Sequence, residues 1–192
     1  QACERMKVFK FGGASVKDAA GVRNVAAVLT HFPQDDLLIV VSAMGKTTNA
    51  LEEVVWAYTE GRDTRGNVEA LRTAHMAVLA DVAPGDTAAH ALLDESFRGL
   101  LRMLGQRPSG RVDEDYDQIV SLGELWSTVV VSAHLKHMGL TNTWLDARTV
   151  VCTDDSFRSA RVEWKACEDR AARLLRPLFA ATPTRVLTQG FI

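Results

Sequence analysis

The feature that most constrains the fold is an unbroken aliphatic run, Asp-Leu-Leu-Ile-Val-Val-Ser, at residues 36–42. A strand with one face in water alternates apolar and polar side chains, and this run does not alternate. It is therefore typical of a strand that is buried on both faces in a parallel sheet. A fold built around such a strand needs helices on the faces of the sheet.

The rest of the chain alternates between predicted strands and predicted helices, as a parallel sheet covered by helices requires. Turn residues and apolar periodicity divide it into further elements. The predicted strands are Met6–Phe11, Thr141–Leu145 and Arg185–Ile192, and the predicted helices are Val16–Phe32, 49–60, 65–82, 87–105, Glu114–Met138 and Val162–Phe179. This order predicts an α/β fold, a three-layer sandwich on a largely parallel sheet with an extra helical segment in the middle.

The sequence Gly45-Lys46-Thr47 resembles the end of a Walker A phosphate loop. That loop needs a glycine five residues before Gly45, because its backbone must curl around the phosphates. The residue there is Val40, inside the aliphatic run, and a β-branched residue does not take up such a curl cheaply. We therefore expect Lys46 to lie on the loop of a substrate pocket instead.

Two predicted strand ends carry groups suited to an anion. Lys10 and Gly12-Gly13 close the first strand, and glycines let a backbone approach a phosphate. Ser42 and Thr48 follow the second strand, where a helix begins. Taken singly, a Gly-Gly pair after a strand is more often only a tight turn, and threonine at a helix start is commonly only a cap. If the two strands are neighbours, however, Lys10 and the hydroxyls surround one crevice.

Composition limits the class of ligand and the compartment. The chain has 192 residues, is 47% hydrophobic, and carries a net charge of −2 without a basic run, which argues against nucleic acid or an anionic membrane as a partner. Three cysteines, Cys3, Cys152 and Cys167, lack metal-site spacing and are predicted to be reduced thiols in a cytoplasmic protein. Residues 1–5 are predicted to be a leader before a natural start at Met6.

Five segments, in order along the chain, resemble the aspartate kinases of the amino-acid kinase family. They are KFGGASV (10–16), VVSAMGKTTNAL (40–51), SLGELWST (121–128), WLDARTVVCTDDSF (144–157) and VLTQGFI (186–192). Ala14 stands where that family usually has threonine. The resemblance covers nearly the whole chain and corresponds to the N-terminal portion of the family pattern.

The resemblance implies ATP-dependent phosphorylation of the L-aspartate side-chain carboxylate, the first step toward lysine, threonine and methionine. It implies ATP and Mg²⁺ as cofactors and a homo-oligomer for the full-length protein. It also assigns roles to residues at the strand ends. Lys10 would be catalytic and bridge the transferring phosphate, while the other implied contacts are Gly12, Gly13 and Ser15 for the ATP phosphates and Ser42, Thr48, Glu124, Gly190 and Phe191 for aspartate.

Glu124 is implied to receive the substrate ammonium. Its predicted helix carries an inward stripe made of Tyr116, Ile119, Val120, Gly123, Ser127, Val130 and His134, and Glu124 lies at its edge. By helix geometry alone a solvated flank is equally expected there. Other candidate residues are predicted to be structural. Asp146, Arg148 and Asp155 match structural positions of the family, and His134 and His137 are not expected to bind a metal. The tryptophans Trp126, Trp144 and Trp164 are expected to fill the core or an interface.

The family pattern continues beyond Ile192 into segments that supply a metal ligand and the nucleotide half. We therefore expect residues 6–192 to be the amino-acid-binding lobe, with no metal ligand of its own and no turnover alone. Two alternatives stay open. The first is a kinase for another amino-acid carboxylate such as glutamate, and the second is a non-catalytic interaction fragment that pairs through an exposed strand at Arg185–Ile192. A nicotinamide site is disfavoured, because Gly12-Gly13-Ala14 lacks the required glycine spacing.

Overall fold

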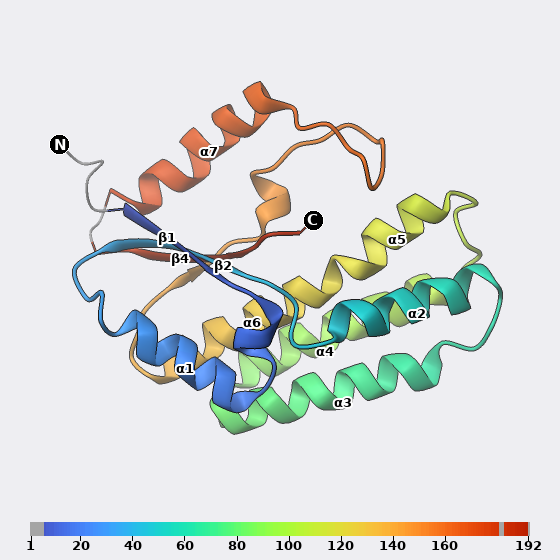
Figure 1. Ribbon diagram of the computed structural model, residues 1–192, viewed down its shortest axis with the longest axis horizontal. Coiled ribbons are helices and arrows are strands. Elements are labelled where there is room, and N and C mark those ends of the chain that lie inside the picture. Colours follow the sequence, from blue (N-terminus) through green and yellow to red (C-terminus); the bar gives the residue numbers. More distant parts are fainter. Residues whose placement is uncertain (1–5, 181–182, 192) are drawn as a thin grey trace.

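A four-stranded parallel sheet forms the centre of the computed structural model, which describes residues 6–180 and 183–191 (Figure 1). The strands are β1 (Met6–Phe11), β2 (Asp36–Val41), β3 (Thr143–Trp144) and β4 (Arg185–Gln189), in the spatial order β1-β2-β4-β3. All three pairings are parallel. The largely parallel sheet predicted from the sequence is confirmed.

The aliphatic run forms β2, which lies between β1 and β4. Leu37, Ile39 and Val41 are fully buried, whereas Leu38 and Val40 on the other face are half-buried. Burial is therefore deeper on one face of the sheet than on the other. Register pairs Lys10 with Val40 and Val40 with Thr188, so these three positions form one row across the sheet.

The last strand is not exposed, contrary to the expectation for Arg185–Ile192. β4 lies between β2 and β3, and residues 186–189 are buried. The strand ends at Gln189, so Gly190 and Phe191 continue as a loop, and Ile192 lies outside the described residues. The strand-edge argument for an interaction fragment is therefore wrong.

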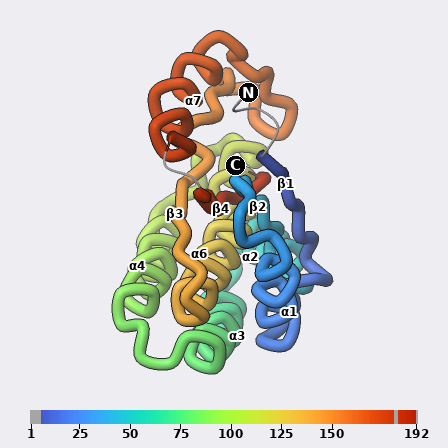
Figure 2. The backbone as a smooth tube through the Cα atoms, turned by 90° about the vertical axis from the view of Figure 1, so that its left-hand side faces the viewer, coloured from blue at the N-terminus to red at the C-terminus, as the bar shows by residue number. Residues whose placement is uncertain are grey.

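Most helices cover the more deeply buried face of the sheet (Figures 1 and 2). They are α1 (Ala19–Leu29), α2 (Thr47–Thr59), α3 (Arg65–Val82), α4 (Thr87–Leu104), α5 (Val112–Val120) and α6 (Leu122–His137). α6 packs directly against the sheet, and α3 and α4 pack behind α6. The helices α3 and α4 form the extra helical segment that was predicted from the sequence.

The core is centred on α6, in which residues 126–135 are all buried. The indole of Trp126 stacks on Phe97 of α4 with 3.9 Å between ring centroids, and it donates a hydrogen bond to Ser96 at 2.8 Å. Every member of the predicted inward stripe is buried. A helix that crosses the middle of the molecule can fix loops on either side of it.

Two predicted helices differ from the structure. The long helix at Glu114–Met138 is divided into α5 and α6 at Ser121, whose hydroxyl donates to the Gln118 carbonyl at 3.4 Å. Such back-bonding by serine bends helices. The helix predicted from Val16 instead begins at Ala19, because residues 13–16 form a short 3-10 helix and the Asp18 side chain caps α1.

The opposite face of the sheet is covered by α7 (Trp164–Leu178), which completes the three layers (Figure 2). None of its residues is buried. Trp164 is 72% exposed, so it is not a core residue, whereas Trp126 is fully buried. The segment before α7 follows a short 3-10 helix, η3 (Ala147–Thr149), and contains a bridge between Thr153 and Val162.

Candidate functional site

The carboxyl ends of β1 and β2 are joined by backbone contacts. The Ser42 amide donates to the Phe11 carbonyl at 2.9 Å, and the Gly45 amide donates to the Gly13 carbonyl at 3.0 Å. A Cβ on Gly13 would lie 2.6 Å from the Ala43 carbonyl oxygen, which no side chain tolerates. Gly13 is therefore needed for the two loops to meet. The two strands are neighbours, which was the condition for one shared site.

Lys10 lies at this junction with Ser42. Its Nζ is 3.4 Å from the Ser42 hydroxyl, and its side chain is exposed. A Cβ on Gly12 would meet nothing within 4 Å, and the backbone there is extended. The ammonium group of Lys10 thus lies beside the Ser42 hydroxyl, and the nearby backbone at Gly12 is open to approach. Ser15 is also exposed, and its backbone amide donates a hydrogen bond to the Gly12 carbonyl at 2.9 Å.

Glu124 holds the loop that follows β4. Its Oε2 accepts hydrogen bonds from the amides of Gly190 at 2.7 Å and Phe191 at 2.6 Å. Bonds to an ionised acceptor are stronger than those between neutral groups, so they fix the loop well. The carboxylate is half-buried, and a Cβ on Gly190 would lie 3.1 Å from Val40. Glu124 therefore lies at the same edge of the sheet as Lys10, which neighbours Val40 in the register.

Ser127 is a residue of the site that the sequence reading assigned only to the core. Its hydroxyl donates to the Ser42 carbonyl at 2.7 Å, and its side chain is fully buried. Ser127 lies three residues after Glu124 on α6, and residues at that spacing share a helix face. One helix turn thus holds both the β2 loop and the β4 loop. The spacing in the segment SLGELWST is the sequence signal that could have indicated this pairing.

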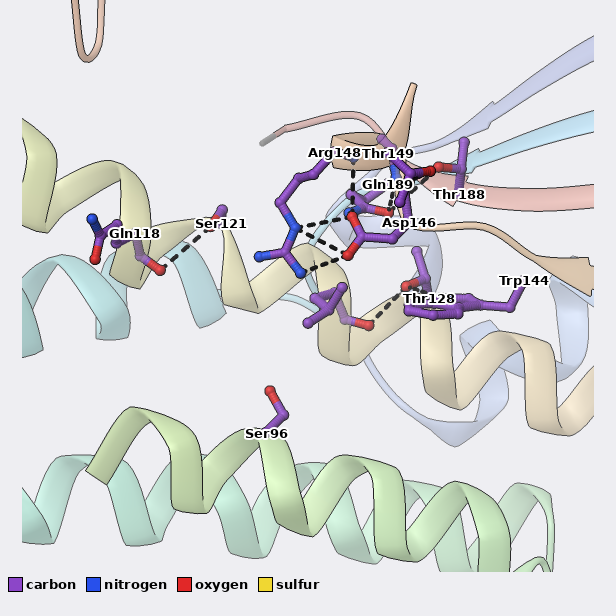
Figure 3. Close-up of polar contacts among 12 residues, drawn as sticks. Ser96, Gln118, Ser121, Thr128, Trp144, Asp146, Arg148, Thr149, Thr188 and Gln189 are labelled. Carbon is purple, nitrogen blue, oxygen red and sulfur yellow. Dashed lines mark hydrogen bonds and ion pairs between the residues drawn. The ribbon is translucent and has the colours of Figure 1, made fainter. Parts of the chain in front are cut away.

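A second polar cluster fixes the end of β4 from the other side (Figure 3). The side-chain amide nitrogen of Gln189 donates to the Asp146 carboxylate at 2.7 Å, and its side-chain oxygen accepts from the backbone amide of Ala147 at 3.1 Å. Arg148 binds Asp146 through Nε and a terminal nitrogen, the latter at 2.6 Å. Burial acts to raise the pKa of the Asp146 carboxyl, but hydrogen bonds from Arg148 and Gln189 outweigh it and hold the pKa below its ordinary value.

The remaining implied positions lie close by but have different surroundings. Thr48 is exposed in the first turn of α2, whereas its neighbour Thr47 is buried, with its hydroxyl 3.5 Å from Nε2 of His75. Lys46 lines a cavity of about 290 Å³ together with Lys17 and His75. Neither Ser42 nor Glu124 is among the residues that line this cavity.

Asp154 and His134, which lie away from the strand ends, have structural partners. Asp154, not Asp155, accepts backbone hydrogen bonds, from Ser156 and Arg161, both at 3.0 Å. His134 is buried and bonds the Val82 carbonyl through Nδ1 at 2.7 Å. Over residues 6–180 and 183–191, no three His, Cys, Asp or Glu side chains group so that they could hold a metal ion.

The fold and this site together define an α/β protein in which an exposed ammonium group and two fixed loops lie at the carboxyl ends of parallel strands. The sequence model of the amino acid kinase family matches residues 5–192, and the chain belongs to that family. Within it, the bifunctional aspartokinase/homoserine dehydrogenase 2 of Escherichia coli is 30% identical to this chain over 190 residues. That match covers 97% of this chain and 22% of the relative, so the chain spans about a fifth of its length.

Solved aspartokinases share the fold. Aspartokinase III of E. coli in complex with lysine and aspartate superposes with a TM-score of 0.86 at 27% identity, covering 98% of this chain and 41% of that one. The same enzyme in complex with aspartate and ADP gives a TM-score of 0.83. The resemblance to aspartokinases drawn from the sequence motifs is therefore confirmed. No helix in the described residues is long and apolar enough to cross a membrane.

Proposed function

We propose that this chain forms the amino-acid-binding part of a kinase that transfers the γ-phosphoryl group of ATP to the side-chain carboxylate of L-aspartate. The observation that carries the proposal is the joint placement of two groups at one sheet edge. Glu124 organises the loop at Gly190 and Phe191, and Lys10 lies beside Ser42 on the neighbouring strand ends. The similarity to aspartokinases supports aspartate as the acceptor.

The reaction must bring two anions together, and its catalysis consists mainly of positioning and charge neutralisation. Lys10 would neutralise charge on the transferring phosphoryl group and the attacking carboxylate. Gly12 and Gly13 would let the ATP phosphates approach the backbone, with the Ser15 hydroxyl beside them. No three His, Cys, Asp or Glu side chains in the described residues group so as to hold a metal ion by themselves, and a magnesium ion would take most of its ligands from the ATP phosphates and water. No step is therefore assigned to the metal.

Aspartate would bind between the two loops that α6 holds. The Glu124 carboxylate would accept the substrate ammonium while keeping its bonds to the β4 loop, and an ion pair in this half-buried position orients the substrate. The hydroxyls of Ser42 and Thr48 and the backbone at Phe191 would complete the pocket. Both Ser127 and the Asp146 cluster would act as positioning groups, because they touch loops and not the substrate.

Calorimetric titration of the 192-residue chain with L-aspartate and L-glutamate tests the proposal. We expect aspartate to bind more tightly than glutamate. Glu124→Gln keeps an oxygen for the loop amides but removes the charge, so it should weaken aspartate binding by about tenfold or more, since a hydrogen bond to a charged group contributes about 1.5–3 kcal/mol. Glu53→Gln on the exposed side of α2 is the matched control and should bind as the parent does.

Lys10→Met provides a second test, because removal of the ammonium group should lower the weak affinity of the chain for a non-hydrolysable ATP analogue, measured by the same titration, while leaving the fold intact. Lys7→Met on the same strand is its control, since Lys7 pairs with Asp35 and faces Phe32. Equal affinity for aspartate and glutamate would point to the alternative of a different carboxylate substrate. Unchanged aspartate affinity in Glu124→Gln would contradict the proposed site.

A further inference from the structure

Two cysteines that are not part of the strand-end site lie in contact. Cys152 follows η3, and Cys167 lies in the first turn of α7. The Cys167 sulfur accepts a hydrogen bond from the Cys152 amide at 3.1 Å and donates one to the Cys152 carbonyl at 3.5 Å. Both residues are half-buried free thiols.

The backbone around the two cysteines is held in a fixed frame. The Glu163 amide donates to the Cys152 carbonyl at 2.8 Å, and the Cys167 amide donates to the Glu163 carbonyl at 3.0 Å. A disulfide joins Cα atoms about 4.4–6.8 Å apart. The Cys167 sulfur lies 3.1 Å from the Cys152 amide nitrogen, so the two backbones approach each other closely, and closure needs the Cys152 side chain to rotate toward Cys167.

We propose that Cys152 and Cys167 are a redox modification site that closes to an intramolecular disulfide in the presence of a low-molecular-weight disulfide such as oxidised glutathione. The thiolate of one cysteine attacks a sulfur of glutathione disulfide and releases one glutathione thiolate. The thiolate of the other cysteine then attacks the protein sulfur of the mixed disulfide and releases the second glutathione. Two protein thiols are oxidised, one glutathione disulfide is reduced, and the two protons pass to the released glutathiones.

The cross-link would act on the segment between the two cysteines. Residues 153–162 form a hairpin closed by the Thr153–Val162 bridge, and α7 beyond it has no buried residue to anchor it. A disulfide at the base of the hairpin would link the hairpin covalently to α7. The segment begins next to η3, where Ala147 bonds Gln189 at the end of β4, so oxidation would also stiffen the support of the strand-end loop. This inference does not depend on the identity of the substrate.

Mass spectrometry in a glutathione redox buffer tests the inference on the whole chain. Cys3 lies outside the described residues, so the reference protein is Cys3→Ser, in which only the proposed pair remains. We expect this protein to lose the mass of two hydrogen atoms on oxidation, and proteolysis to yield one peptide pair linked through Cys152 and Cys167. Its Tm should rise by several degrees, because the link restricts the unfolded chain.

The double variants Cys3→Ser/Cys152→Ala and Cys3→Ser/Cys167→Ala are the controls. Each should gain one glutathione and show no rise in Tm, and circular dichroism should confirm that each is folded. If a control does not fold, the inference is tested by hydrogen exchange on the Cys3→Ser protein alone. The amides at 150–163 should then exchange more slowly after oxidation than before it. Stable glutathionylation of both cysteines, disulfide-linked dimers, or no reaction in the Cys3→Ser protein would overturn the inference.

Discussion

At the scale of single residues, the two adjoining glycines at the end of β1 serve different needs. Gly13 faces the carbonyl of Ala43, and a methyl group there would lie 2.6 Å from that oxygen. Gly12 has an ordinary backbone conformation and faces open space. The fold therefore needs only the second glycine, whereas the backbone at the first lies open to approach.

This difference predicts opposite outcomes for two matched substitutions. Gly13→Ala should lower the free energy of unfolding by about 1–3 kcal/mol, because overpacking against the fixed backbone at Ala43 forces the loops apart. Gly12→Ala should change it by no more than about 0.5 kcal/mol, as expected for a surface position without a special contact. Urea unfolding of both variants measures the difference. Equal destabilisation by the two would show that the loops do not meet as described.

The contacts of Glu124 show what could and could not be predicted for the site. Helical spacing placed Glu124 at the edge of a buried stripe, and the family motif assigned it to the substrate. Its bonds to Gly190 and Phe191 join residues 66 and 67 positions apart. Local patterns carry no information on such distant partners. The same limit explains why the bond from Ser127 to Ser42 was missed, because its partner lies 85 positions away.

At the scale of helices and strands, the boundaries of α2, α3 and α4 lie within about two residues of those read from the sequence, which is the usual spread for helix ends. Glycine and proline mark these ends clearly. The division between α5 and α6 has no such mark, because Ser121 keeps helical dihedral angles while its side chain bonds the preceding turn. Local propensity therefore located the helices but not the bend.

The hairpin before α7 is held on α5 by one unusual residue. Arg158 has a φ of 60°, in the left-handed region that favours glycine. Its amide donates to Asp117 at 2.6 Å, and its guanidinium lies 4.0 Å from the ring centroid of Tyr116. Tyr116 in turn donates to Glu52 of α2 at 2.6 Å. Strain of this kind persists only where contacts outweigh it.

Removal of the Arg158 side chain should therefore release the hairpin without unfolding the protein. Arg158→Ala loses the contact with the Tyr116 ring, which contributes about 0.5–2 kcal/mol, but keeps the unfavourable φ. We expect amides at 150–163 to exchange several times faster in hydrogen exchange, with little change in global stability. Arg173→Ala on the exposed side of α7 is the control. Unchanged exchange in Arg158→Ala would mean that other contacts, such as the backbone bond to Asp117 and the Arg111–Phe157 contact, hold the hairpin without the Arg158 side chain.

At the scale of the whole molecule, α6 connects the sheet to the helical layers and also carries both loop contacts of the site. The alternation of strands and helices predicted the layers and the parallel sheet. It did not predict that β4 lies inside the sheet, because strand order depends on crossovers between distant segments. The burial of the α6 stripe followed from periodicity, whereas the identity of its partners depended on the complete fold.

Behind α6, the core contains a histidine that no role in phosphoryl transfer requires. His75 of α3 is 3% exposed, and its ring lies 5.3 Å from the Trp126 ring and 6.0 Å from the Phe97 ring. Its Nδ1 bonds the Leu71 carbonyl at 2.8 Å. Burial lowers the pKa of His75, and the bond to Leu71 only partly opposes this shift. The folded protein therefore holds the imidazole neutral near pH 7.

A neutral buried histidine makes the stability of the whole molecule depend on pH. Below about pH 6.5 the unfolded chain protonates at His75 and the folded chain does not, so stability falls with pH by up to about 1.4 kcal/mol per unit until the lowered folded pKa is reached. His75→Gln can keep the bond to Leu71 but cannot ionise, so urea unfolding should show a shallower loss between about pH 7 and pH 5. His31→Gln, at an exposed position, should keep the parent slope. Equal slopes in all three proteins would show that the pKa of His75 is not lowered by folding.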